Sequence, residues 1–178
     1  MSREMNSVKL APPKVQKIKG VNADPLIEGV KFSEVKLFSD ERGFLMEILR
    51  SDNNDFDGGK VGQIICSMAY PGVVKGWHIH KKQIDRLAAI KGMIKVVLYD
   101  AREESPTYSV INEFVLGDRN PAIIYVPPGI FHGIKCIGTE PSFLIGCPSE
   151  LYNPEAVDEL RLDPHSDVIP YDWDCHDG

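Results

Sequence analysis

Apolar and polar residues alternate with a period of two along much of this chain, and the 3.6-residue period of a helix is rare. Residues 27–37 alternate in this way in places, and short runs rich in Val, Ile, Leu and aromatic residues follow. These runs cover residues 44–49, 62–68, 73–80, 86–90, 93–99, 108–116, 122–126, 131–137 and 143–146. Gly, Pro, Asn and Asp lie between most of them. The pattern predicts an all-β domain, built as an antiparallel sandwich or a small barrel.

Two segments depart from this alternation. Residues 1–26 include three prolines and have weak patterning, so we expect an N-terminal arm followed by one domain over residues 27–178. Residues 154–160 are the one place where we expect a short helix. No Gly-rich loop joins a strand to a helix, which disfavours a Rossmann or P-loop nucleotide site.

The composition of the chain argues against two kinds of binding partner, nucleic acids and membranes. The chain has 178 residues, of which 43% are hydrophobic, and a formal net charge of −6. An acidic chain disfavours a nucleic-acid partner. No apolar run approaches the roughly 20 residues that span a bilayer, so no membrane partner is expected. The four cysteines lack paired spacing, which indicates reduced thiols in a cytoplasmic protein.

Three of the five histidines are candidates for a shared site. His78 and His80 flank one residue of a predicted strand, so both side chains point to the same face. Asp85 follows His80 after four residues, and His132 comes after a Pro-Pro-Gly turn. This spacing resembles the two signatures of the cupins, and the resemblance implies a double-stranded β-helix, or jelly-roll barrel.

Imidazole and carboxylate groups together suit a divalent transition metal. If a metal is bound, the expected ligands are His78, His80, Asp85 and His132. The alternative is that these side chains are hydrogen-bonded groups that line a polar pocket without an ion.

A second resemblance extends over residues 27–173. Its motifs are DERGFLME at 40–47, Gln63, Ser67, KGWH at 75–78, Gln83, DAREESPT at 100–107, PPGIFHG at 127–133, YNP at 152–154 and IPYDW at 169–173. In order and spacing these motifs resemble the dTDP-4-dehydrorhamnose 3,5-epimerase family, which is itself cupin-like.

This resemblance implies an epimerase or isomerase that acts on a nucleotide-linked 4-keto-6-deoxy sugar, without a cofactor and as a homodimer. His78 would be the base that removes the proton beside the ketone, oriented by Asp163 or, alternatively, by Asp167. The resemblance also implies contacts with the substrate from Arg42, Phe44, Glu47, Gln63, Lys75 and His132.

Two catalytic groups of the family are missing. Asp85 stands where the family has the lysine that stabilises the enolate oxygen, and Ile145 stands where it has the tyrosine that returns the proton. Arg86, next to Asp85, points to the opposite face of a regular strand and cannot replace the lysine directly. A carboxylate at this place opposes the negative charge of an enolate.

Three hypotheses follow from this substitution. In the first, His78 is a free base and Lys75 or Arg42 stabilises the enolate. In the second, a metal on the candidate ligands supplies the positive charge, which excludes His78 as a base because its nitrogen is then coordinated. In the third, the protein is a non-catalytic module that binds sugar nucleotides.

Overall fold

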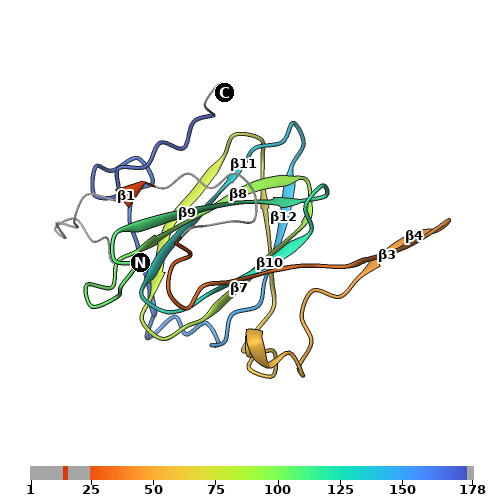
Figure 1. The fold of residues 1–178 in the computed structure, drawn as a ribbon, viewed down its shortest axis with the longest axis horizontal. Coiled ribbons are helices and arrows are strands. Elements are labelled where there is room, and N and C mark those ends of the chain that lie inside the picture. Colours follow the sequence, from red (N-terminus) through yellow and green to blue (C-terminus); the bar gives the residue numbers. More distant parts are fainter. Residues whose placement is uncertain (1–13, 16–24, 176–178) are drawn as a thin grey trace.

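The computed structural model describes residues 14–15 and 25–175, and in these residues it contains two main β-sheets and one separate hairpin (Figure 1). The first sheet has the order β1 (Lys14–Val15), β9 (Val110–Gly117), β8 (Met93–Asp100), β11 (Ile130–Cys136), β6 (Val74–His80), β13 (Glu159–Arg161). The second has the order β2 (Lys31–Glu34), β10 (Ala122–Val126), β7 (Asp85–Lys91), β12 (Ser142–Gly146), β5 (Ile65–Ala69). All pairs are antiparallel except β1 with β9. The predicted all-β domain is confirmed, whereas most of the predicted arm over residues 1–26 lies outside the described residues.

The alternation of side chains explains why β8 is buried on both faces. Ile94, Val96 and Leu98 pack in the main core, which contains apolar residues of both sheets. Val97 and Tyr99 point the other way, into a second cluster that contains the C-terminal residues Ile169 and Trp173. The C-terminal segment therefore covers the outer face of the first sheet.

The helix expected at residues 154–160 is absent, and this part of the prediction is wrong. A turn forms instead, in which the Ala156 N–H donates to the Asn153 carbonyl at 3.2 Å. The chain then continues as β13, which pairs with β6 so that Glu159 lies opposite His80 and Arg161 opposite His78. Pairing with an open sheet edge supplies the backbone partners that a helix would have provided. In the described ranges there is no α-helix, only the short 3-10 turn Asn54–Phe56.

Arg86 anchors a loop to the second sheet. Its side chain is fully buried and donates hydrogen bonds to the carbonyls of Phe56, Asp57, Lys60 and Cys147. The expectation that Arg86 points away from the face of Asp85 is confirmed, because four main-chain acceptors hold it on the other side of β7.

The hairpin of β3 (Leu37–Asp40) and β4 (Gly43–Met46) projects away from the two sheets (Figure 1). It pairs only with itself within the described part of the chain. Phe38, Phe44 and Leu45 on it are 46%, 60% and 61% exposed. Such exposure of apolar side chains on a short two-stranded ribbon indicates an element that is not stable by itself.

Candidate active site

A cavity of about 540 Å³ lies among strands of both sheets. Its apolar part comes from Ile65, Leu87, Ile134 and Leu144. Its polar part consists of Ser67, Lys75, His78, His80, Asp85, His132, Glu159 and Arg161. Only Lys75 and Arg161 among these described residues carry a permanent positive charge.

Strand pairing brings the three histidines together. His78 and His80 alternate on β6 and both reach the cavity, as predicted, and His132 on β11 is the direct cross-strand partner of His78. The ring centroids of His132 lie 5.9 Å from His78 and 5.6 Å from His80. Asp85, at the start of β7 in the other sheet, completes the group.

Asp85 connects the two deeper histidines. Its Oδ2 atom lies 3.2 Å from Nε2 of His80 and 3.2 Å from Nε2 of His132. Burial works to raise the pKa of Asp85, but the contacts with both imidazoles outweigh it and hold that pKa far below its usual value. Burial likewise works to lower the pKa of His132, and the facing carboxylate reverses this and raises it. The cluster therefore favours an ionised Asp85 with a positive charge beside its carboxylate.

His78 has a different partner. Its Nδ1 atom lies 3.2 Å from Oε2 of Glu159, and Arg161 contacts the other oxygen of the same carboxylate. Burial works to raise the pKa of Glu159, but His78 and Arg161 lower it to about 2. An ionised Glu159 favours the tautomer with a proton on Nδ1, which leaves Nε2 unprotonated and able to act as a base.

The structure does not place Asp163 or Asp167 at His78. Both are exposed, and Asp163 accepts a hydrogen bond from the His165 N–H at 2.8 Å in a turn. The reason is that β13 ends at Arg161, so the chain has left the edge of β6 before Asp163. Glu159 was missed, although the charged–apolar–charged pattern of residues 159–161 is typical of a short edge strand.

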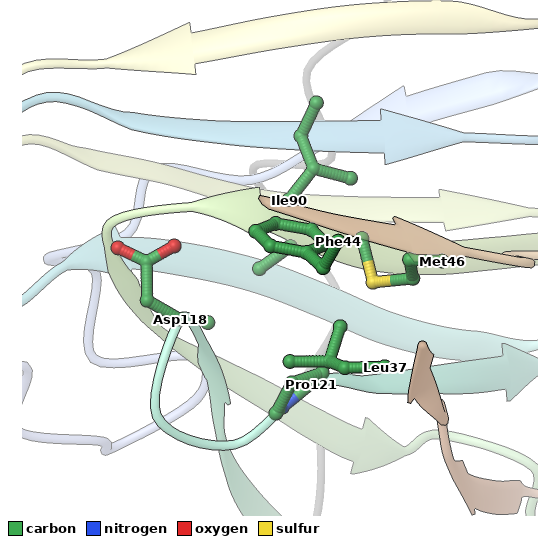
Figure 2. Close-up of a pocket in the computed structure, with 8 residues that line it drawn as sticks. Leu37, Phe44, Met46, Ile90, Asp118 and Pro121 are labelled. Carbon is green, nitrogen blue, oxygen red and sulfur yellow. The ribbon is translucent and has the colours of Figure 1, made fainter. Parts of the chain in front are cut away.

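Three of the expected substrate contacts lie on or just after the projecting hairpin, outside the cavity of their own chain. Arg42 pairs with Asp40 at the tip of the hairpin. Phe44 lines a separate small pocket, where Figure 2 shows it beside Ile90 and Met46. Glu47, just after the hairpin, contacts Arg50.

The remaining expected contacts divide between the cavity and its surroundings. Lys75 and His132 line the cavity, and Nζ of Lys75 donates to Ser67 Oγ at 2.9 Å and to the Met68 carbonyl at 2.6 Å. Gln63 does not line it, and its Oε1 accepts from the Tyr152 N–H at 3.3 Å.

The position expected for a catalytic tyrosine faces away. Leu144 of β12 lines the cavity, whereas its neighbour Ile145 lines a different, mostly apolar pocket together with Cys147. The site therefore combines His78, an imidazole that faces a carboxylate, with a carboxylate–imidazole cluster, an arrangement that suits proton transfer at carbon or metal binding.

Comparison with known proteins agrees with this geometry. The profile of the family described as dTDP-4-dehydrorhamnose 3,5-epimerase matches residues 25–176. Agl13 of Haloferax volcanii, a probable low-salt glycan biosynthesis epimerase, is 42% identical over 152 residues, which cover 85% of this chain and 97% of that protein. SpsL of Bacillus subtilis, a spore coat polysaccharide biosynthesis protein, is 36% identical over 148 residues, covering 83% and 97%. The crystal structure of a dTDP sugar isomerase from Desulfovibrio desulfuricans has a TM-score of 0.77 at 30% identity, covering 83% of this chain and 92% of that one.

The two-sheet cupin jelly roll, here with three histidines lining its cavity, is the fold of epimerases and isomerases that act on sugar nucleotides. The chain belongs to the dTDP-4-dehydrorhamnose 3,5-epimerase family. The prediction of the family and of the cupin fold is thereby confirmed, and membership favours an enzyme over a non-catalytic binding module. No helix among the described residues is long and apolar enough to cross a membrane.

Proposed function

We propose that this protein removes and returns a proton at a carbon beside the ketone of a nucleotide-linked 4-keto-6-deoxy sugar. The observation that carries the proposal is the cavity-lining His78 with Glu159 3.2 Å from its Nδ1 atom. Nε2 of His78 takes the proton, the electrons of the C–H bond form the carbon–carbon double bond of an enolate, and the negative charge moves to the ketone oxygen. Return of a proton to the opposite face of that carbon inverts it.

Charge and burial in the cavity suit such a substrate. Lys75 and Arg161 line it and supply two cations for a diphosphate or an enolate oxygen. Leu87 and Leu144 form part of an apolar wall, which excludes water from the reacting carbon and strengthens these electrostatic contacts.

The proposal predicts exchange of a carbon-bound proton with solvent. In D2O, the protein is expected to incorporate deuterium beside the ketone of a dTDP-4-keto-6-deoxy sugar, as measured by proton NMR and mass spectrometry. The matched control is dTDP-glucose, which has no ketone to acidify the C–H bond and should not exchange. Binding without exchange for dTDP, CDP, UDP and GDP 4-keto sugars would contradict the proposal and favour a non-catalytic binding module.

We further propose a cytoplasmic homodimer. The four cysteines form no disulfide, as expected in a reducing compartment. In the part of the chain that the structure describes, β5 is an edge strand of the second sheet. Ile65 at its start and Ile64 just before it are 48% and 70% exposed. Ile65 also lines the cavity. A hairpin from a second copy that packs along this edge would cover both apolar surfaces and bring Arg42 near the cavity mouth.

The dimer proposal predicts that Leu45→Lys produces a monomer, because it places a charge on an apolar face that we propose to be buried in the dimer. Light scattering coupled to gel filtration should give twice the chain mass of 19.9 kDa for the wild type and that mass for the variant. The KM for the sugar nucleotide should rise in the variant. Val115→Lys is the control, since Val115 is 43% exposed on β9 and belongs neither to the hairpin nor to β5. A monomeric wild type, or a Leu45→Lys variant that stays dimeric, would contradict this arrangement.

A further inference from the structure

His80, Asp85 and His132 form a buried group distinct from the pair of His78 and Glu159. Each of the three residues is no more than 8% exposed, and one ligand atom from each lies within 4.8 Å of the others. His78 lies outside this group in the structure, and its Nδ1 faces Glu159 instead. The four-residue metal set expected from the sequence is therefore reduced to three.

The hydrogen bonds around His132 leave its Nε2 atom as a ligand. Its Nδ1 lies 3.3 Å from the Ile130 carbonyl, which only accepts, so Nδ1 carries the proton of the neutral ring. Nε2 is then the nitrogen that faces Asp85 Oδ2, at 3.2 Å, and either a proton or a metal ion can lie between these two atoms. A histidine that donates one ring N–H to a carbonyl and binds a metal through the other nitrogen is a common arrangement.

His80 faces the same carboxylate oxygen. Its Nε2 lies 3.2 Å from Asp85 Oδ2 and 3.2 Å from Gln83 Nε2, so two imidazole nitrogens converge on one oxygen of Asp85. Two ligands at about 2.1 Å from a metal and at right angles to each other lie about 3 Å apart, close to these separations. The second oxygen of Asp85 accepts a hydrogen bond from Gln83 Nε2 at 2.9 Å, which orients the carboxylate as an outer partner does in metal sites.

We infer that His80, Asp85 and His132 bind one divalent first-row transition metal ion and that His78 stays outside the coordination sphere as the base. Two imidazoles and one carboxylate suit Zn²⁺, Fe²⁺, Mn²⁺ and Co²⁺ with open coordination positions. The catalytic role of the ion rests on the proposed function. A bound ion would supply, beside His78, the positive charge that a lysine supplies in other members of the family. The base and the metal, which exclude each other if His78 is a ligand, are compatible in this geometry.

The test is metal binding to the full-length protein after treatment with EDTA and dialysis. Calorimetry with Zn²⁺ and with Mn²⁺, and the visible absorption of added Co²⁺, should show one ion per chain. Asp85→Asn and His132→Gln should each weaken binding by about 100-fold or more, whereas His78→Gln should bind as the wild type does. His165→Gln is the matched control, because His165 is exposed in a turn.

Thermal denaturation gives a second readout in case a variant is unstable. A metal that binds the folded state raises Tm, so the wild type and His78→Gln should gain Tm on addition of Zn²⁺, while the ligand variants should not. Absence of binding to the wild type would overturn the inference and identify the group as a proton-bridged cluster. Equal binding by Asp85→Asn and His132→Gln, or its loss in His78→Gln, would also overturn it. These measurements contain no substrate, so their outcome is independent of the deuterium-exchange test.

Discussion

His78→Gln is expected to lower kcat by about 10³-fold, because the variant lacks the only base that we place at the reacting carbon. Glutamine is polar and similar in reach, but its amide does not accept a proton at neutral pH. The same loss should appear in turnover of the 4-keto sugar nucleotide and in the rate of deuterium incorporation, since both begin with breaking the C–H bond.

His165→Gln serves as the matched histidine control for this experiment. His165 is exposed in the turn that follows β13, and its removal should change neither rate nor stability. If His78→Gln retained turnover within tenfold of the wild type, His78 would not be the base, and proton abstraction would have to be assigned to another residue of the cavity.

Glu159→Gln is expected to lower kcat by about 10²-fold with little change in KM, since the change affects the tautomer of His78 rather than substrate contacts. The pKa of Glu159 is about 2, so this carboxylate is ionised throughout the working range and does not itself limit the rate at low pH. The fall in kcat without a rise in KM, measured by steady-state kinetics, is the readout that a purely structural role would not produce.

Two further variants make this prediction specific. Glu155→Gln is the control, because Glu155 is an exposed carboxylate of the same segment. Asp163→Asn compares the carboxylate expected from the sequence with the one found in the structure. A larger loss in Asp163→Asn than in Glu159→Gln would show that Asp163 orients His78 during catalysis and that Glu159 does not.

The sequence could predict the two sheets because a half-buried strand has a period of two that is visible in the chain. It could not predict β13, since the turn at Asn153 and the pairing with β6 depend on an edge strand about 80 residues earlier. A short run of residues with helix-compatible side chains takes the conformation that tertiary pairing offers.

The sequence could group cavity residues where they share one strand or one signature. The resemblance to the cupin signatures groups His78, His80, Asp85 and His132, and all four line the cavity. The sequence could not predict the position of side chains that depends on strand pairing or on the path of a hairpin. Glu159 reaches His78 through strand pairing, and the spacing of Arg42 and Phe44 does not reveal that their hairpin leaves the body of its own chain.

Two adjacent residues at the start of β7 point to opposite faces of the sheet. Asp85 lines the cavity, while Arg86 donates hydrogen bonds to the carbonyls of Phe56 and Asp57 and so anchors their loop. A slip of one residue along this strand would turn Arg86 toward the histidines and Asp85 toward the opposite face of the sheet. By anchoring the loop, Arg86 fixes the register of β7 that places Asp85 in the cavity. A substitution at Arg86 is therefore expected to disturb the site as well as the loop.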